Sequence, residues 1–349
     1  IDDPSAYFQT TLYTGNGGTN AITNTGNSDL QPDWIWFKRR DGADNHIVFD
    51  VVRGVTKAIY PDLDNLEDTL SNSLSSFNSD GFTLGADTAS GGSINGSSET
   101  CVAWQWKAGT SVSGTTTGSG TGKAYTGSVN TDAGFSIIRY LGNSSAGHTI
   151  PHNLGAVPKM IIGHGLTGSD TTSWTVYHQS LGATKTVSLN ERAAASTSTV
   201  WNNTTPTSSV VSLGSSGNVN DNDDAFILYS FAEKQGYSKI SSYVGNGNAD
   251  GTFVYTGFKP AWLMAFHTTA GNENWMLVDN KRDGFNVENE QLFPNTNIAE
   301  ESNDEVDLLS NGFKLRRANT RMNGSGATYI FMAFAENPFV ASNFVTTTA

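Results

Sequence analysis

The sequence has little of what several common protein classes require. Among its 349 residues there is one cysteine, Cys101, so no disulfide can form within the chain and a small buried apolar role is expected for it. The net charge is −13, and no basic cluster is longer than Lys38-Arg39-Arg40 or Arg316-Arg317, which argues against nucleic-acid binding. No apolar run approaches the ~18 to 20 residues of a membrane span, so no membrane insertion is expected.

Recognisable catalytic and metal-binding motifs are also missing. The six histidines are scattered, and neither a zinc-protease HExxH motif nor a GxSxG nucleophile elbow occurs. His148 and His152 lie four residues apart, but Pro151 between them indicates a turn rather than a helical metal site. We therefore expect a protein that is not an enzyme and has no cofactor.

What is present is a repeated pattern of apolar runs among many small polar residues. Glycine occurs 37 times and charged residues make up only 15% of the chain, a composition typical of short strands joined by turns. Three similar apolar runs stand out, and each resembles a closing strand: Cys101 to Ala108, Ala225 to Glu233, and Tyr329 to Glu336.

Two further markers keep step with these runs. A proline precedes an apolar run at Pro32, Pro158 and Pro260, and the closing aromatics Trp106, Phe231 and Phe334 follow these prolines by 74, 73 and 74 residues. A Tyr-x-Gly-Asn motif leads each set, beginning at Tyr13, Tyr140 and Tyr243. Three markers in one order and at nearly fixed spacing indicate tandem repeats of domain size.

The repeat predicts an all-β protein of three tandem β-sandwich domains, of jelly-roll or lectin-like type. We name residues 1–109 unit 1, residues 134–236 unit 2 and residues 237–349 unit 3. Residues 110–133, of which 16 of 24 are Gly, Ser or Thr, are expected to be a linker, either flexible or a long ordered arm. Since no such spacer separates units 2 and 3, these two are expected to pack as a pair.

Three local expectations follow. Leucines at helical spacing after Pro61 predict a short helix over residues 63–74. The polar tail, residues 340–349, is expected to be loosely held. Because the chain begins at Ile1, the natural N-terminus is expected to be processed or to lie outside this sequence.

Carboxylates offer two candidate sites. Asp50 and Asp279 stand at equivalent places and are followed by Arg53 and Arg282, which favours a structural ion pair or turn cap over catalysis. The cluster that includes Asp221, Asp223 and Asp224 supplies oxygen ligands of the type that calcium takes, but it lacks the Gly-x5-Glu part of an EF-hand, which favours a solvated hairpin tip.

The tryptophans suggest one glycan-contact site. Trp201, followed by Asn202 and Asn203, lies among Ser, Thr and Asn residues, and an exposed ring flanked by amides suits stacking on a sugar. The others are expected in the core because they alternate with apolar neighbours: Trp34, Trp36, Trp104 and Trp106.

Several motifs resemble a repeat family of tail-fibre-like and appendage virion proteins of tailed, often marine, bacteriophages. These motifs are Tyr13 to Gly17, Leu30 to Asp41, Val51 to Gly54, Asp80 to Gly85, Val102 to Ala108 and Phe331 to Phe339. The resemblance implies a non-enzymatic structural component located in the virion. Its partners would be copies of itself, other virion proteins and a glycan of the host-cell surface. Unit 2 departs from the pattern, because His178 stands near the place of the two aspartates and no arginine follows it.

Three functions remain open at this stage. The leading one is a structural virion protein, a tail-fibre or appendage subunit that serves assembly and host-surface attachment. The second is a carbohydrate-binding, lectin-like module, which would be a monomer with an exposed aromatic cleft. The third is a glycan-degrading enzyme, which needs two carboxylates converging in one groove.

Overall fold

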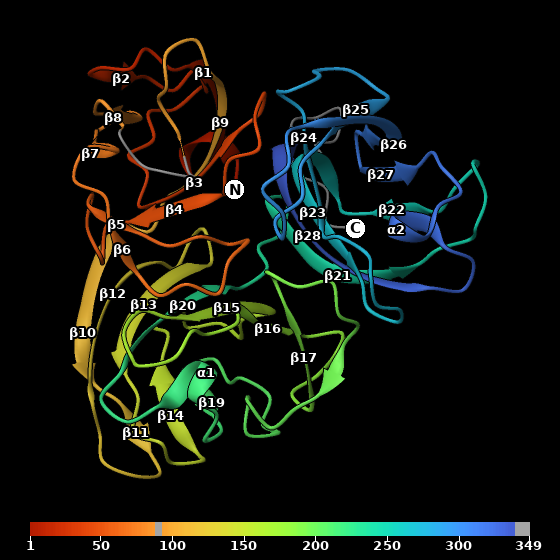
Figure 1. The fold of residues 1–349 in the computed structure, drawn as a ribbon. Helices are drawn as coiled ribbons and strands as arrows, with labels where there is room; N and C mark the ends of the chain where they lie inside the picture. The colour runs from red at the N-terminus through yellow and green to blue at the C-terminus, as the bar shows by residue number, and fades with distance from the viewer. Residues whose placement is uncertain (88–92, 339–349) are drawn as a thin grey trace.

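The computed structural model describes residues 1–87 and 93–338, and its regular elements in these residues are nearly all β-strands. Figure 1 shows three lobes arranged around a common centre, with unit 1 at the upper left, unit 3 at the upper right and unit 2 below. The helices are single turns: η1 (Pro4–Ala6), α1 (Gly217–Asn220) and α2 (Thr320–Asn323). Within the described residues, none of the helices has the length and apolar character needed to cross a membrane.

Each unit builds an inner sheet whose four strands follow the same order. The order is first, last, second and third strand of the unit, and all neighbours are antiparallel. The inner-sheet strands of unit 1 are β1 (Phe8–Thr14), β9 (Thr100–Trp106), β3 (Trp34–Arg39) and β4 (Ile47–Asp50). Those of unit 2 are β13 (Phe135–Leu141), β20 (Ala225–Phe231), β15 (Met160–Gly165) and β16 (Thr175–His178). Those of unit 3 are β21 (Ser238–Val244), β28 (Thr328–Pro338), β23 (Phe258–His267) and β24 (Met276–Asp279).

A smaller outer sheet accompanies each inner sheet. In unit 1 it contains β2 (Asn20–Ile22), β8 (Phe82–Leu84) and β7 (Leu74–Phe77). In unit 2 it contains β11 (Thr117–Gly118), β14 (His148–Pro151) and β19 (Val210–Leu213). In unit 3 it contains β22 (Phe253–Tyr255), β27 (Gly312–Leu315), β26 (Glu301–Leu309) and β25 (Glu288–Gln291). The remaining strands are β5 (Lys57–Ala58), β6 (Asp68–Thr69), β17 (Lys185–Ser188) and β18 (Ser196–Thr197).

The closing strands are mostly apolar because both of their faces are buried. In β28, Ile330, Met332 and Phe334 enter one core, and the residues between them enter another. Side chains of a strand alternate between faces, so a strand placed between two cores has apolar residues at most positions; Gln105 and Ser230 are buried polar exceptions in β9 and β20. The three runs that looked like closing strands are therefore the last strands of the inner sheets.

One of these cores is shared by all three units. It joins side chains from every inner sheet, among them Trp34 and Trp106 of unit 1, Phe231 of unit 2, and Trp262 and Phe334 of unit 3. Each unit also has a core of its own between its inner and outer sheets. Units 2 and 3 pack together as expected, and unit 1 contacts both of them through the shared core.

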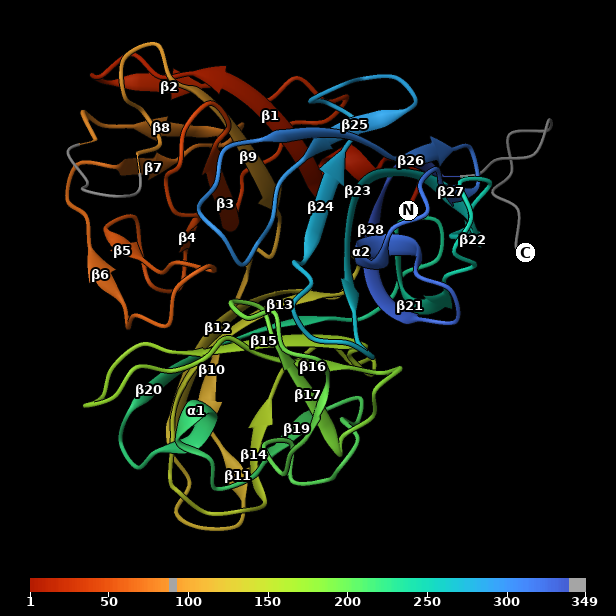
Figure 2. The same ribbon diagram turned by 45° about the vertical axis from the view of Figure 1, so that its right-hand side comes forward.

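The segment predicted to be a linker is part of the sheets of unit 2. Its strands β10 (Thr110–Thr115) and β12 (Ala124–Asn130) extend the inner sheet beyond β13, and β11 pairs with β14 of the outer sheet. The ordered-arm alternative is therefore correct. Ser and Thr side chains are compatible with strand pairing, but a segment with so few large apolar residues does not by itself indicate a strand. Figure 2 shows this arm lying along the outside of unit 2.

The predicted helix over residues 63–74 is absent. The segment instead forms β6 and turns, and its backbone reaches unit 2 through a bond from the Glu67 amide to the Leu166 carbonyl (3.2 Å). Leu63 and Leu70 are only partly buried against the core of unit 1, so no apolar helix face is needed. The tail expected to be loosely held lies outside the described residues.

Candidate functional site

Trp201 is not a glycan-contact residue. Its side chain is 0% exposed, and its ring meets that of Tyr177 edge to face within the core of unit 2 (centroids 6.0 Å apart). Asn202 and Asn203 adopt left-handed backbone conformations, with φ of 50° and 49°, as turn residues do. The polar neighbours of Trp201 therefore reflect a turn that anchors a buried ring, and the prediction from them is wrong.

The acidic cluster in unit 2 does not form a metal site. Asp221 and Asp223 are exposed, and Asp223 pairs with Lys123 of the arm. Nowhere in residues 1–87 and 93–338 are three or more His, Cys, Asp or Glu side chains placed to hold a metal ion. The solvated-tip interpretation fits the positions of these aspartates.

The Tyr-x-Gly-Asn motif has a structural role that recurs in each unit. The tyrosine hydroxyl of unit 2, Tyr140, donates to the Val219 carbonyl (2.6 Å), and the amide of Asn143 donates to Asn220 Oδ1 (3.0 Å). The same pairs of bonds occur in units 1 and 3, where they join Tyr13 to Ile94, Asn16 to Asn95, Tyr243 to Met322 and Asn246 to Asn323. The buried acceptor asparagines were not predicted; their signal in the sequence is a nearly constant distance of 82, 80 and 80 residues from each tyrosine.

The repeated Asp-Arg pairs are buried ion pairs that also cap a turn. Asp50 Oδ2 lies 2.5 Å from Arg53 Nε, and Asp50 Oδ1 accepts from the amides of Val52 and Arg53 (3.0 and 2.9 Å). Asp279 and Arg282 repeat this arrangement at 2.7 Å. Burial alone would lower the pKa of the Arg53 guanidinium, but the charge of Asp50 outweighs it and raises that pKa. The prediction of a structural pair is confirmed.

These pairs sit at the seams between units. The Tyr229 hydroxyl of unit 2 donates to Asp50 Oδ2 of unit 1 (2.7 Å), and Trp104 Nε1 of unit 1 donates to Asp279 Oδ2 of unit 3 (2.9 Å). At the third seam, His178 Nε2 of unit 2 lies 3.4 Å from the Phe331 carbonyl of unit 3. The three contacts run in one cyclic direction, so the units meet head to tail.

A second ring of bonds is made by the residues four positions before Asp50, His178 and Asp279, and each of these contacts the other neighbouring unit. His46 Nε2 lies 3.1 Å from the Phe293 carbonyl, and the indoles of Trp174 and Trp275 donate to the carbonyls of Tyr60 and Ser188 (2.9 and 3.0 Å). The three units are therefore related by an approximate threefold arrangement within one chain.

His178 replaces the aspartate of unit 2 and gives the seam a dependence on pH. Its Nδ1 accepts from the Ser180 amide (3.1 Å), which reproduces the turn cap, and burial lowers the pKa of its imidazole to about 4. The unfolded imidazole titrates near ~6.5, so between pH 6.5 and 4 only the unfolded chain takes up this proton and the folded state loses stability.

We expect this loss to appear when the wild type is compared with His178→Gln. The advantage of the wild type over the variant should be largest at pH 7 and should shrink by up to about 3 kcal/mol towards pH 4. Urea denaturation of both proteins across this range measures it. A difference that stays constant with pH would show that His178 is not held neutral.

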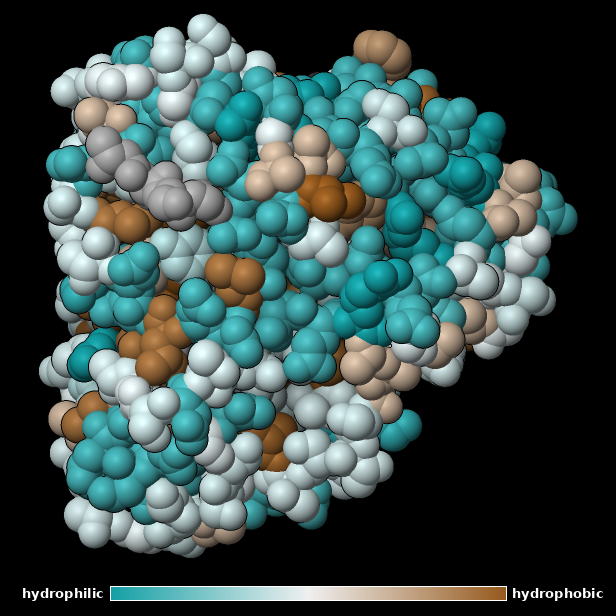
Figure 3. Space-filling view, viewed as in Figure 1, coloured by the Kyte–Doolittle hydropathy of each residue, from teal (hydrophilic) through white to brown (hydrophobic). Residues whose placement is uncertain are grey.

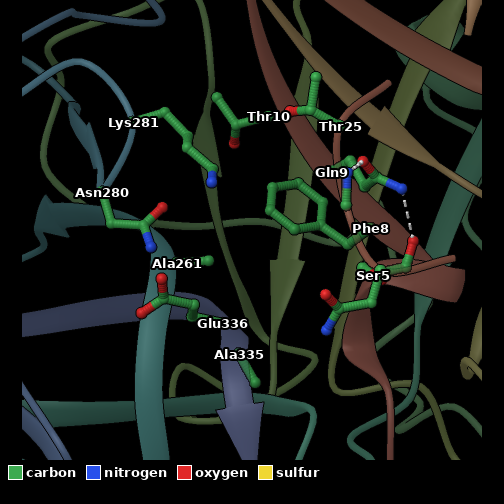
Figure 4. A pocket seen from close by; sticks show the side chains of 12 residues that line it. Ser5, Phe8, Gln9, Thr10, Thr25, Ala261, Asn280, Lys281, Ala335 and Glu336 are labelled. Carbon is green, nitrogen blue, oxygen red and sulfur yellow. Dashed lines mark hydrogen bonds between the residues drawn. The ribbon is translucent and has the colours of Figure 1, made fainter. Parts of the chain in front are cut away.

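A pocket lies at the seam between units 1 and 3, with a volume of about 210 Å³. Figure 4 shows Asn280, Lys281 and Glu336 on the unit 3 side and Ser5, Gln9 and Thr25 on the unit 1 side, with the Phe8 ring between them. Two buried polar atoms of the lining, Thr10 Oγ1 and Asn280 Oδ1, have no hydrogen-bond partner within the described chain. The pocket thus combines an apolar wall with unfilled hydrogen-bonding capacity.

The profile of a family described as a domain of unknown function (DUF7483) matches residues 3–338. No curated protein matches the chain.

Proposed function

Since the chain belongs to the DUF7483 family, whose function is unknown, we propose from its own architecture that it is a structural virion protein of a tailed bacteriophage. In this proposal it is a tail-fibre or appendage subunit that serves assembly and attachment to the host surface. The three units act as tandem lectin-like β-sandwich domains. The resemblance of its motifs to phage appendage repeats supports this assignment, and so does its construction.

The construction suits a rigid display platform. Asp50, Asp279 and His178 are buried beside the shared core, and each forms a hydrogen bond to a neighbouring unit. These titratable groups therefore hold the units together. A head-to-tail ring keeps three outer sheets in fixed relative positions. This is the observation that carries the proposal.

Open strand edges in unit 3 provide a surface for assembly. In unit 2 the arm pairs with both β13 and β14, whereas among the described residues no strand pairs with the outer edges of the equivalent strands of unit 3, β21 and β22. Val244, Phe253 and Tyr255 on these strands are 54%, 44% and 43% exposed. Unpaired edges with exposed apolar side chains favour strand-to-strand contacts with other chains. The face in Figure 3, by contrast, is mostly hydrophilic with small, separate apolar groups.

We expect the purified chain to associate through this edge. Sedimentation of the wild type should show a concentration-dependent oligomer that Tyr255→Asp shifts to monomer, because the new charge would be buried in the contact. Phe285→Asp is the matched control, since Phe285 is 73% exposed on the same unit but lies outside these strands.

The virion assignment has its own test. An antibody against the chain should label particles of the phage that encodes it, and mass spectrometry of purified particles should detect the chain. If infected cells produce the chain but purified phage particles do not contain it, the assignment is overturned.

The pocket at the seam between units 1 and 3 favours one alternative, a carbohydrate-binding module. A monodisperse monomer that binds a defined sugar on a glycan array and needs no partner protein would support this alternative over the virion role. A glycan-degrading enzyme is the third reading, and turnover of a bound glycan by the purified chain would support it.

A further inference from the structure

The seam between units 2 and 3 shows how this kind of junction is closed. Ile240 lies on β21, the open edge strand, and its backbone groups point away from β28. Gln179 Nε2 of unit 2 donates to the Ile240 carbonyl (2.5 Å), and the Ile240 amide donates to Glu233 Oε2 (3.1 Å). Two side chains thus occupy the hydrogen-bonding groups of the edge strand and fill the junction.

Strand register identifies the counterparts of these residues at the seam between units 1 and 3. Gln179 directly follows β16, and Asn280 directly follows β24. The last residues of these strands, His178 and Asp279, pair with Met160 and Trp262, which occupy equivalent positions in units 2 and 3. Glu233 and Glu336 each lie two residues after the closing aromatic. Ile240 pairs with Met332 and Thr10 pairs with Trp104, and each of these partners lies two residues before the closing aromatic of its strand.

At the seam between units 1 and 3 the closing bonds are not made. Asn280 is one methylene shorter than Gln179, and no hydrogen bond joins it to Thr10 in the described chain. Glu336 turns instead to Lys259, 2.6 Å away. The pocket of about 210 Å³ occupies the space that the longer side chain fills elsewhere.

The unfilled groups point to a ligand with several hydroxyls. Asn280 is 8% exposed and Thr10 is 7% exposed, and each carries an oxygen that has no partner among residues 1–87 and 93–338. A buried acceptor without a partner is unfavourable, so a ligand that donates to it gains affinity. Phe8, Ala261 and Ala335 give the same pocket an apolar wall suited to the C–H face of a ring.

The seam between units 1 and 2 lacks this combination. There the edge strand β13 is paired with β12 of the arm, so its outward backbone groups are already satisfied. The counterpart of Gln179 is Val51, which has no side-chain hydrogen-bonding group. A pocket of about 600 Å³ also lies at this seam, lined by Val51 and residues of the arm, but none of its lining side chains has a buried polar atom without a partner in the described chain. The unfilled hydrogen-bonding groups therefore distinguish the pocket between units 1 and 3.

We propose that the pocket at the seam between units 1 and 3 binds a single sugar ring. Its volume is below the roughly 300 to 1,000 Å³ of sites for drug-sized ligands, and its lining of amides, hydroxyls and one apolar wall fits a polyhydroxylated ring. The choice of a sugar rests on the proposed function, because attachment to a host surface requires recognition of the groups displayed there.

Titration of the full-length chain with hexoses, N-acetylhexosamines and hexuronic acids, followed by saturation-transfer NMR and calorimetry, tests the proposal. At least one class should bind at millimolar concentration. Asn280→Gln should weaken that binding about tenfold or more, because the longer amide closes the pocket as Gln179 does. Its melting temperature should be equal to or above that of the wild type, which separates pocket closure from misfolding.

Gln179→Asn is the matched control at the closed seam. It should lower stability, since the Ile240 carbonyl loses its donor, and should leave sugar affinity unchanged. Absence of binding for all three sugar classes would overturn the proposal, and so would wild-type affinity in Asn280→Gln or binding of an extended peptide along β1 in place of a sugar. If the chain still binds host cells in these cases, the pocket inference alone fails; if it binds no cells and is absent from virions, the proposed function fails.

Discussion

Replacing Asp50 with alanine is expected to lower the free energy of unfolding by about 3 to 5 kcal/mol. The substitution leaves the fully buried guanidinium of Arg53 with Glu67 at 3.5 Å as its nearest remaining carboxylate. It also removes the acceptor for two turn amides and for the Tyr229 hydroxyl across the seam. Urea denaturation at pH 7 measures the change.

The equivalent substitution in unit 3 should cost less. In Asp279→Ala the guanidinium of Arg282 keeps a close partner, Glu300, at 2.8 Å. Asp307→Ala is the surface control, because its partner Arg316 is 42% exposed and such pairs contribute at most about 1 kcal/mol. Equal losses for Asp50→Ala and Asp307→Ala would show that burial does not govern these pairs.

A double-mutant cycle tests whether the Asp50 pair couples the units. Tyr229→Phe removes only the hydroxyl that reaches Asp50 from unit 2. If the bond from the Tyr229 hydroxyl to Asp50 stabilises the seam, the decreases in unfolding free energy caused by Asp50→Ala and Tyr229→Phe should be non-additive by about 1 kcal/mol or more. Strict additivity would mean that the bond between Tyr229 and Asp50 does not couple the two units.

The repeat could be predicted from the sequence because its markers are direct consequences of packing. Trp106, Phe231 and Phe334 keep their distance from the preceding prolines because each pairs across the sheet with the residue two positions after its proline, which is Trp34, Met160 or Trp262. Burial of both strand faces selects apolar residues at most positions, and such runs are visible in a sequence. The all-β character and the core tryptophans followed from this signal.

Other features could not be read because their signals were ambiguous. Trp201 has the polar neighbours of an exposed residue, yet turns place polar residues beside buried anchors as readily as beside surface rings. The leucines after Pro61 have helical spacing, but their segment finds its backbone partners in unit 2. The pocket depends on the difference between Gln179 and Asn280, which has meaning only once strand register makes them equivalent.

The glycine of the Tyr-x-Gly-Asn motif leaves no room for a side chain in any of the three units. A Cβ on Gly245 would lie 2.4 Å from the Gly324 carbonyl oxygen, and the same close approach occurs at Gly15 and Gly142 (2.2 and 2.1 Å). The opposing atoms belong to backbone that the buried asparagine holds in place, so they cannot swing aside as a side chain could.

We therefore expect Gly245→Ala to lower the free energy of unfolding by roughly 2 to 4 kcal/mol, because it forces two backbone segments apart and weakens the bond from the Asn246 amide to Asn323 Oδ1. Gly271→Ala is the control in the same unit, since its Cβ would meet its nearest atom at an ordinary 3.7 Å. Urea denaturation of both variants compares them. A loss no larger in Gly245→Ala than in Gly271→Ala would show that the motif glycine serves something other than this close backbone contact.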